Sequence, residues 1–353
     1  MSSETQEAVI LVGVGNIEFG ERPIPTCGPH SVKVKIEATG ICGSDVHYFM
    51  HGSIGSFQLK APMVLGHESS GTVVEVGENV TMVKVGDRVA IEPGVPSRYS
   101  SETKAGKYNL CPHMAFAATP PYDGTLVKYY LSPEDFLYKL PESVSFEEGA
   151  LLEPLSVGVH ANKLAGTKFG DTVVVFGAGP VGLLSAGVAK AFGATTVLVV
   201  DIIDFKLNKA KELGATHVLN SGSFQDPGAL GTKIRGLVGA NPDITIDCTG
   251  SYMCINAAIQ VCRPGGTHVQ VGLGEDNVTI PIVEVTNKEL KISGSFRYSA
   301  GDYSTALKLI ASKQIDAAKL VTRKFKFEEA IEAYKFNAKP NDYNIKTIIE
   351  GPK

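Results

Sequence analysis

The stretch Thr172–Gly182, TVVVFGAGPVG, decides the fold of the middle of this 353-residue chain. Its beginning, TVVVF, is a continuous apolar run, which is typical of a strand buried on both faces of a parallel sheet. The run leads into a G-x-G-x-x-G turn, and Val181–Phe192, rich in alanine, leucine and valine, follows as a predicted helix. A strand, a glycine-rich turn and a helix in this order predict the start of a doubly wound nucleotide-binding sheet.

Each glycine of the turn has its own structural task. Gly177 permits the tight turn, Gly179 lets the backbone approach a pyrophosphate, and Gly182 allows the helix to pack closely on the sheet. The helix N-terminus then offers unpaired N–H groups and a positive dipole end to the phosphates. A glycine-rich turn alone is a weak signal, so the prediction of a dinucleotide site depends on the strand and the helix around it.

Asp201 indicates which dinucleotide binds. It follows a second buried strand, Thr196–Val200, and lies 19 residues after Gly182, where a carboxylate accepts hydrogen bonds from the adenosine ribose hydroxyls. This carboxylate would repel the 2′-phosphate of NADP, by about 4 kcal/mol for unit charges 4 Å apart at an effective dielectric constant of about 20. Lys206, a nearby cation, would soften the repulsion. The sequence therefore predicts NAD over NADP.

Patterns elsewhere divide the chain into two kinds of structure. After about residue 150, buried strands alternate with helices, which argues for a parallel doubly wound sheet. The first 150 residues instead show short alternating strands between turn signals, which predict a β-rich barrel or sandwich. The predicted strands are 31–38, 71–77, 86–91, 172–176, 196–200, 243–248 and 267–271, with strand-like segments at 320–327 and 345–349. The predicted helices are 147–164, interrupted by Pro154, then 181–192 and 303–312.

Composition excludes several classes of protein. Hydrophobic residues make up 43% and charged residues 20%, and the net charge is −4. A slightly acidic chain argues against a nucleic-acid or anionic-membrane partner, because both need a concentrated basic surface. No apolar run approaches the ~20 residues that span a bilayer, and MSSETQEAVILVGVG lacks the basic start of a signal peptide. Six scattered cysteines favour a reduced compartment, so a cytoplasmic location is expected.

Three short segments carry metal-ligating residues: Cys42, the pair His67 and Glu68, and Glu153. A thiolate, an imidazole and carboxylates form a ligand set that suits zinc, and three protein ligands plus water are typical of a catalytic zinc site. Each residue alone also has an ordinary explanation. Cys42 fits a small core residue, and Glu153 fits the carboxylate of a helix start. His67 and Glu68 would equally make a surface ion pair.

Several motifs in order resemble the zinc-dependent medium-chain alcohol dehydrogenases. The run Gly66-His67-Glu68-x-x-Gly71-x5-Gly77-x-x-Val80 matches their zinc signature, and the resemblance extends from about residue 8 to about residue 350. The segments GICGSDVHY, PMVLGHESSGTVVEVG, EPLSVGVHA and GSFRY resemble the polyol branch, which contains sorbitol and xylitol dehydrogenases. The stretch Glu92–Tyr130 is especially similar to fungal members of that branch.

The resemblance implies an α/β fold with two domains. Residues 1–154 together with 290–353 would form a GroES-like β-rich catalytic domain, and residues 155–289 a Rossmann NAD-binding domain with a doubly wound parallel sheet. Relatives are commonly tetramers or dimers, so a homotetramer or homodimer is expected.

The resemblance also implies roles for individual residues. Cys42, His67 and Glu68 would hold one catalytic zinc with water as the fourth ligand. Glu153 would be an alternative ligand or a hydrogen-bond partner of that water. Ser44 matches the hydroxyl that starts a proton relay, and His47 and Glu153 are further candidate catalytic residues. The substrate pocket would be lined by Tyr48, Phe116, Glu153, Arg297 and Tyr298. NAD would contact Gly177, Gly179, Val181, Gly182, Asp201, Lys206, Val271, Gly272, Leu273, Ser295, Phe296 and Arg297.

One departure from the family concerns its second, structural zinc. Many relatives bind it with four cysteines spaced C-x2-C-x2-C-x7-C, and here the corresponding residues are Ser97, Ser100, Thr103 and Cys111. Hydroxyls do not replace thiolates as zinc ligands at neutral pH. We therefore expect no structural zinc and only the catalytic zinc in each chain.

These features predict a zinc-dependent dehydrogenase that oxidises a polyol, sorbitol or xylitol or both, to the 2-ketose with NAD. Hydrogen-bond donors on Arg297, Tyr48 and Tyr298 suit a substrate with several hydroxyls better than a simple alcohol. Three alternatives are an arabinitol or threonine-type dehydrogenase, a zinc-free quinone reductase, and a non-catalytic nucleotide-binding protein. Cys42 and the pair His67 and Glu68 speak against the zinc-free enzyme and the non-catalytic protein.

Overall fold

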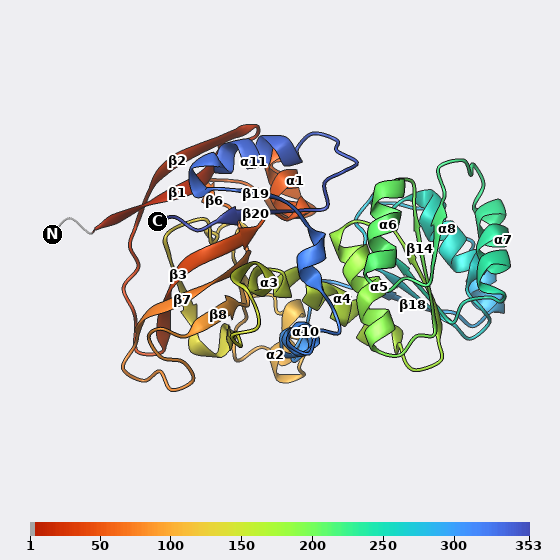
Figure 1. Cartoon of the computed structure of the whole chain (residues 1–353), viewed down its shortest axis with the longest axis horizontal. Helices are drawn as coiled ribbons and strands as arrows, with labels where there is room; N and C mark the ends of the chain where they lie inside the picture. The colour runs from red at the N-terminus through yellow and green to blue at the C-terminus, as the bar shows by residue number, and fades with distance from the viewer. Residues whose placement is uncertain (1–3) are drawn as a thin grey trace. The chain divides into compact units, whose positions relative to one another are not determined.

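The computed structural model describes residues 4–353 and divides the chain into two compact units (Figure 1). Unit 1 contains the residues up to Glu153 together with Val321–Lys353, and unit 2 contains Pro154–Leu320. Unit 1 is built mainly from antiparallel strands, and unit 2 from one parallel sheet with helices on both faces. Each unit has its own hydrophobic core. The predicted class, a GroES-like β-rich domain with a Rossmann domain, is confirmed.

The main sheet of unit 1 has seven strands. The order is β12-β8-β7-β3-β20-β19, and β11 also pairs with β3. Along β3, the buried side chains of Val32, Val34 and Ile36 alternate with more exposed ones, as the pattern SVKVKIEA predicts. The strands are β3 (Ser31–Gly40), β7 (Glu68–Val76), β8 (Arg88–Ile91), β11 (Tyr129–Pro133), β12 (Leu137–Lys139), β19 (Val321–Phe325) and β20 (Lys346–Glu350).

The last two strands of the chain complete the sheet that its first half begins. β20 runs antiparallel to β3, with Ile348 opposite Gly40, and β19 runs parallel to β20. The sequence placed the second domain junction at residue 290, whereas in the structure unit 2 continues to Leu320. One reason is β18 (Lys291–Gly294), which pairs with β17 (Thr267–Gln270) and so extends the sheet of unit 2 past residue 290.

Smaller elements surround the main sheet of unit 1. A three-stranded sheet has the order β2-β1-β6, and two further sheets of two strands each pair β4 with β5 and β9 with β10. These strands are β1 (Thr5–Gly13), β2 (Asn16–Pro23), β4 (Ser53–Ile54), β5 (Phe57–Gln58), β6 (Met63–Val64), β9 (Gly94–Val95) and β10 (Ala115–Phe116). The helices are α1 (Gly43–His51), α2 (Ser101–Lys104), α3 (Phe146–Ala150) and α11 (Ala330–Asn337), with single turns η1 (Tyr108–Leu110), η2 (Glu134–Phe136) and η4 (Phe327–Glu329).

The helix predicted for residues 147–164 is in fact two helices, α3 and α4 (Leu152–Ala165). The break falls at Leu151 and not at Pro154. Pro154 lies in the first turn of α4, where a backbone N–H has no partner within the helix, so the missing donor costs nothing there.

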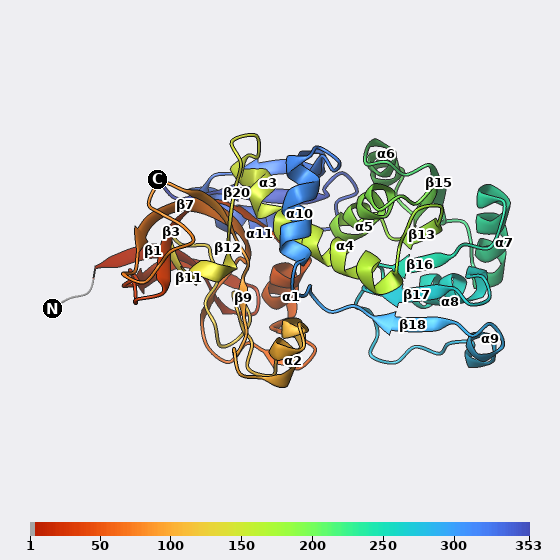
Figure 2. The same cartoon turned by 90° about the horizontal axis from the view of Figure 1, so that it is seen from below.

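The sheet of unit 2 has six parallel strands in the order β15-β14-β13-β16-β17-β18 (Figure 2). Its centre, β13, is flanked by β14 and β16, so the chain order reverses at this strand. The strands are β13 (Thr172–Phe176), β14 (Thr196–Asp201), β15 (His217–Asn220), β16 (Ile244–Asp247), β17 (Thr267–Gln270) and β18. The helices are α4, α5 (Pro180–Ala191), α6 (Asp204–Glu212), α7 (Pro227–Val238), α8 (Tyr252–Val261), α9 (Ile282–Asn287) and α10 (Asp302–Ala311), with the turn η3 (Ala317–Leu320).

Helices cover both faces of this sheet, α5 and α6 on one and α7 and α8 on the other (Figure 1). Val174 and Phe176 of β13 are fully buried in the core under α7 and α8. Val173 and Val175 are equally buried on the opposite face, as the unbroken apolar run predicts. In the part of the chain that the structure describes, no helix is both long and apolar enough to cross a membrane.

Candidate functional site

Cys42, His67 and Glu68 come together in unit 1. Their ligand atoms all lie within 4.8 Å of one another, and no other group of this kind is found in residues 4–353. The register of the sheet explains the meeting, because Gly40 at the end of β3 lies opposite Glu68 at the start of β7. A Cβ on Gly40 would stand 2.1 Å from a carboxylate oxygen of Glu68, so only glycine fits there.

Asp45 lies against two of these residues. Its Oδ1 lies 3.3 Å from Nδ1 of His67, and its Oδ2 accepts a hydrogen bond of 3.3 Å from the backbone N–H of Cys42. A carboxylate on one ring nitrogen leaves the other free to bind a metal. Burial lowers the pKa of His67, but Asp45 and the Cys42 thiolate outweigh it and raise that pKa well above 6.5.

Lys346 of β20 binds the carboxylate of Glu68. Its Nζ lies 2.7 Å from both carboxylate oxygens and 3.0 Å from the carbonyl oxygen of Ile41. The side chains of Lys346 and Glu68 are 2% and 0% exposed, so this is a buried ion pair. Burial disfavours the charge of Lys346, yet Glu68 and the Cys42 thiolate raise its pKa above the ordinary value.

Tyr334 completes the buried surroundings of the cluster. It lies on α11, beside α1 (Figure 1), and its hydroxyl is buried with no hydrogen-bond partner among the described residues. Burial and the negative charges of Asp45, Cys42 and Glu68 raise the pKa of this hydroxyl well above its ordinary value. A site that holds protons this firmly is also favourable for a cation. The donor set and the local charge both fit a zinc ion.

The other residues predicted for unit 1 lie at different depths. Phe116 packs beside His67, with the two ring centroids 5.7 Å apart. Ser44 is half-buried in the first turn of α1, and His47 is exposed one turn later. Tyr48 is 2% exposed and packs in the apolar core. Glu153 is 5% exposed and lies outside the cluster of three, although its charge helps to raise the pKa of Lys346.

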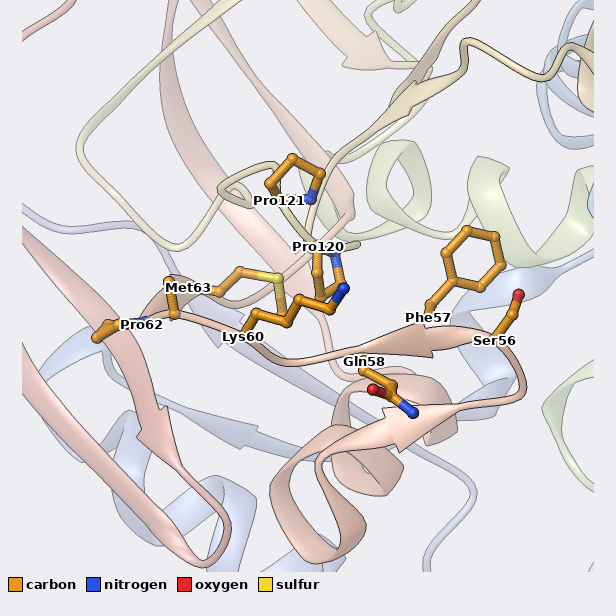
Figure 3. Close-up of a pocket in the computed structure, with 9 residues that line it drawn as sticks. Ser56, Phe57, Gln58, Lys60, Pro62, Met63, Pro120 and Pro121 are labelled. Carbon is orange, nitrogen blue, oxygen red and sulfur yellow. The ribbon is translucent and has the colours of Figure 1, made fainter.

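One pocket of unit 1 contains none of the predicted site residues. It has a volume of about 350 Å³, and Figure 3 shows Pro120 and Pro121 across it from the strand that carries Phe57 and Gln58. Lys60 is the only titratable group in its lining. The chemistry therefore points to the cluster of Cys42, His67 and Glu68 and not to this pocket.

In unit 2, the predicted nucleotide contacts follow the carboxyl ends of adjacent parallel strands, the edge at which such sheets bind ligands. Gly177 has φ of +94°, and a Cβ on Gly182 would lie 1.8 Å from its carbonyl oxygen. A Cβ on Gly179 would meet nothing within 4 Å, so this residue faces open space at the N-terminus of α5. Val181 follows in the first turn. The glycine turn at the N-terminus of α5 therefore has room for a pyrophosphate.

Asp201 ends β14 and is held in place by the backbone. Its Oδ2 accepts a hydrogen bond of 2.6 Å from the N–H of Ala178, and its Oδ1 accepts from Ile202 and Ile203 at 2.8 and 2.9 Å. The carboxylate is thus locked to the glycine turn, and its remaining lone pairs suit ribose hydroxyls. Lys206 lies on α6, half-buried, with no ion pair among the described residues.

The segments after β17 and β18 carry the remaining predicted contacts, which are Val271, Gly272, Leu273, Ser295, Phe296 and Arg297. The hydroxyl of Ser295 is buried without a hydrogen-bond partner in the described chain, which leaves it available to a bound molecule. Arg297 has φ of +55°, a strained value for a residue with a side chain, and its guanidinium stacks on Phe296 at 4.8 Å. Tyr298 is 1% exposed and packs on Tyr303.

Sequence reasoning missed several residues that shape these sites. Asp247 ends β16 and accepts hydrogen bonds from the Thr249 hydroxyl, the Gly250 N–H and the Gln270 amide at 2.6, 2.7 and 2.7 Å. It thereby orders the loops beside the edge of the sheet at which a nucleotide is predicted to bind. A lysine within the apolar strand pattern of 345–349 was a readable signal for Lys346, but nothing local to Asp45 or Tyr334 marked their roles.

The loop predicted to lack a structural zinc is closed by hydrogen bonds. The N–H of Ser97 donates to Sγ of Cys111 at 3.3 Å, and Ser100 caps α2 by accepting from the N–H of Thr103 at 3.2 Å. Burial opposes the thiolate of Cys111, but hydrogen bonds from Ser100, the backbone and Thr103 lower its pKa. Ser97 therefore contacts the Cys111 thiol through its backbone, and Ser100 and Thr103 contact it through their side chains.

Comparisons with known proteins agree over the whole chain. Residues 28–142 match the family described as alcohol dehydrogenase GroES-like domain, and residues 180–312 match zinc-binding dehydrogenase. Sorbitol dehydrogenase 1 of Saccharomyces cerevisiae is 60% identical over 357 residues, with 100% of both chains covered. D-xylulose reductase of the same yeast is 50% identical over 351 residues, with 99% of each covered. The structure of 2R,3R-butanediol dehydrogenase from Bacillus subtilis is 32% identical, with a TM-score of 0.89 over 98% of this chain and 100% of that one.

The chain belongs to the zinc-binding dehydrogenases. The predicted resemblance to zinc-dependent alcohol dehydrogenases, and to fungal sorbitol and xylitol dehydrogenases among them, is confirmed. The prediction of an oxidoreductase is confirmed with it. Membership of this zinc-binding dehydrogenase family implies zinc and NAD(H) as cofactors and a small molecule as substrate.

Proposed function

We propose that this zinc-binding dehydrogenase oxidises a secondary hydroxyl of a sugar alcohol, sorbitol or xylitol or both, to the 2-ketose with NAD. The observation that carries the proposal is the full-length 60% identity to a protein named sorbitol dehydrogenase, joined to a cluster of zinc ligands in this chain. The protein named D-xylulose reductase, 50% identical, supports xylitol as the second substrate. Fructose and xylulose would be the products.

Cys42, His67 and Glu68 would hold one zinc in each chain, with Glu153 as an alternative ligand or as a partner of bound water. When bound, zinc supplies Lewis-acid chemistry that lowers the pKa of a substrate hydroxyl. Asp45 and Lys346 keep the imidazole and the carboxylate in place, as their contacts at 3.3 and 2.7 Å indicate. Three hydroxyl side chains at the positions of cysteine ligands support the absence of a structural zinc.

A proton must leave the substrate hydroxyl, and α1 offers a path for it. Ser44 lies two residues after Cys42 and three before His47, so both side chains lie on one face of the helix. We assign Ser44 as the first acceptor of the proton and exposed His47 as the group that releases it to water. The ring of an exposed imidazole can take up a proton on one nitrogen and release it to water.

Asp201 supports NAD as the partner of this reaction. Its carboxylate is fixed by three backbone N–H groups, so it cannot turn away from a 2′-phosphate. Repulsion between the two groups would then weaken the binding of NADP. The predicted ring-side contacts are Val271, Gly272, Leu273, Ser295, Phe296 and Arg297.

The preference for a polyol would come from side chains with several donors. Arg297, Tyr298 and Tyr48 would donate hydrogen bonds to substrate hydroxyls, and Phe116 would form an apolar wall beside His67. A simple alcohol leaves such donors unpaired, which weakens its binding in the transition state.

We also propose a homodimer or a homotetramer in a reducing, cytoplasmic compartment. β18 is the last strand of its sheet, and its outer edge is open to another strand. Exposed Ile292 on β18, with Ile282 and Val283 on α9, provides apolar surface beside that edge. All six cysteines are free, which supports a reducing compartment.

The test is the initial rate of NADH formation from NAD with sorbitol, xylitol or ethanol at equal concentration. We expect kcat/KM for at least one polyol to exceed that for ethanol by about 100-fold or more. Equal values for polyol and ethanol would contradict the polyol assignment. In Cys42→Ala, the zinc content should fall from one per chain to none and turnover should stop. Zinc that stays bound in this variant would contradict the ligand assignment, whatever the substrate.

A further inference from the structure

Two histidines of α1 form a pair outside the zinc cluster. His47 and His51 are four residues apart, so their side chains leave the same face of the helix. Their ring centroids are 4.6 Å apart, and the ring planes meet at 55°. Both side chains are exposed to solvent. Two imidazoles on one helical face at this spacing are a metal-binding arrangement in proteins.

The hydrogen bond that His47 makes through Nδ1 leaves its Nε2 free to bind a metal. Its Nδ1 lies 2.7 Å from the carbonyl oxygen of Ser53, and a carbonyl only accepts hydrogen bonds, so Nδ1 carries the proton. Nε2 then presents its lone pair to solvent. Metal-bound histidines show this same arrangement, with the second nitrogen donating to a carbonyl or a carboxylate. The tautomer of His47 that a metal needs is therefore already set by this hydrogen bond.

The position on the helix also favours a cation. His51 is the last residue of α1, and the C-terminal end of a helix carries partial negative charge from its unpaired carbonyls. Zinc binds imidazole nitrogens at about 2.0–2.1 Å, so two nitrogens of one tetrahedral ion lie about 3.3 Å apart. Ring centroids 4.6 Å apart place the two imidazoles within reach of one ion of this size. One opposing charge is Lys60, which lines the same cavity as His51.

We propose that His47 and His51 form a second metal site, which takes a borderline divalent cation such as Zn²⁺, Ni²⁺ or Cu²⁺. Imidazole ligands select these ions over Mg²⁺ and Ca²⁺, which prefer oxygen. The site is separate from Cys42, His67 and Glu68, which are buried or half-buried and offer a thiolate and a carboxylate. The two sites therefore differ in accessibility and in ligand chemistry.

Occupation of this site would inhibit turnover, an inference that rests on the role proposed above for His47. An imidazole nitrogen that binds a cation has no lone pair for a proton, so His47 could no longer accept one from Ser44. A dehydrogenase that depends on one zinc would in this way be slowed by an excess of the same metal.

The experiment uses the zinc-loaded holoenzyme and Ni²⁺ as the probe, because elemental analysis counts nickel and zinc separately. After equilibrium dialysis we expect one nickel per chain with the zinc content unchanged. His51→Gln should weaken nickel binding at least about tenfold, while basal NADH formation is retained. His113→Gln, which removes an exposed histidine elsewhere in unit 1, is the matched control and should bind nickel like the wild type. Lys60→Gln should tighten binding, since it removes the opposing charge.

The readouts separate this proposal from the proposed function. Equal nickel binding by the wild type and His51→Gln, or nickel that enters only as zinc leaves, would overturn the second site. Nickel held through His51 with no fall in the rate of the wild type would overturn the inhibitory role. If the enzyme turned over no polyol at all, the proposed function would fail, but the nickel count would still decide whether the pair binds metal.

Discussion

At the scale of single residues, the environment of Glu68 is the feature with the largest energetic consequence. Glu68 is paired with Lys346 in a fully buried site, so a zinc ion that bound Glu68 as proposed would compete with a second cation for its carboxylate. The carboxylate cannot turn to solvent, because both side chains are at most 2% exposed. Lys346 therefore sets how strongly Glu68 can engage the metal.

Lys346→Met should destabilise the zinc-free protein by about 3–5 kcal/mol, because it leaves Glu68 charged and unpaired in the interior. The double variant Lys346→Met with Glu68→Gln removes both charges and should recover much of that loss. Urea unfolding of zinc-free wild type and the two variants gives the comparison. A loss in Lys346→Met below about 1 kcal/mol, the worth of an exposed pair, would show that the pair is not buried in solution.

A second prediction at this scale concerns Asp45 and the effect of His67 protonation on the stability of the fold. Folding raises the pKa of His67 above its unfolded value of 6.5, so the folded zinc-free chain binds this proton more tightly. The stabilisation is complete below pH 6.5 and is lost as the pH rises through the raised pKa.

Asp45→Asn keeps the shape of the side chain but removes the charge, so the zinc-free variant should lose stability at low pH and show a flatter profile above pH 6.5. In the same variant, zinc affinity should fall by about 10–100-fold. The measurements are urea midpoints between pH 5 and 9 and a competition assay for zinc. Parallel pH profiles of wild type and variant would contradict the assignment of Asp45 as the group that holds this proton.

At the scale of elements, the loop around α2 allows the proposed absence of a structural zinc to be tested. The backbone N–H of Ser97 and the side chains of Ser100 and Thr103 make hydrogen bonds with Cys111, so the four positions lie close together. The triple variant Ser97→Cys, Ser100→Cys, Thr103→Cys should raise the zinc content from one to two per chain. At a free zinc concentration 100 times the Kd, zinc binding to the loop should raise the free energy of unfolding by about 2.7 kcal/mol.

Zinc analysis and thermal unfolding at several zinc concentrations would measure this gain. The matched control adds Cys111→Ser to the triple variant, which removes one of four thiolates and should return the zinc content toward one. A triple variant that unfolds at the same temperature with and without zinc would show that the loop no longer has the geometry of the site.

Elements were more predictable from the sequence than the contacts between them. The strands Thr172–Phe176 and Thr196–Asp201 follow from apolar runs, and the zinc cluster follows from motifs near the ends of β3 and β7. Lys346 lies 278 residues from Glu68 along the chain, so no local pattern joins them. The break at Leu151 was also missed, because proline is tolerated in a first helical turn and misleads as a breaker.

At the scale of the whole molecule, the open edge of β18 allows a test of whether copies of the chain associate through this strand. The N–H of Lys291 donates to the carbonyl oxygen of Gly266, just before β17, and the N–H of Ser295 donates to that of Gln270, the last residue of β17. Backbone donors alternate in direction along a strand, so the N–H of Ile292 points away from β17 toward the open edge. A proline at this position removes that outward donor without breaking the bonds to β17.

Ile292→Pro should therefore keep the fold of unit 2 and weaken self-association, if copies of the chain join through β18. Light scattering should show the wild type as a dimer or tetramer and the variant as a smaller species, with the circular dichroism spectrum unchanged. Ile292→Val is the matched control, because it keeps the donor and a branched apolar side chain on the strand, and it should assemble like the wild type. A variant that keeps the full mass would place the interface elsewhere, because an outward N–H takes part in assembly only when a second strand pairs with this edge.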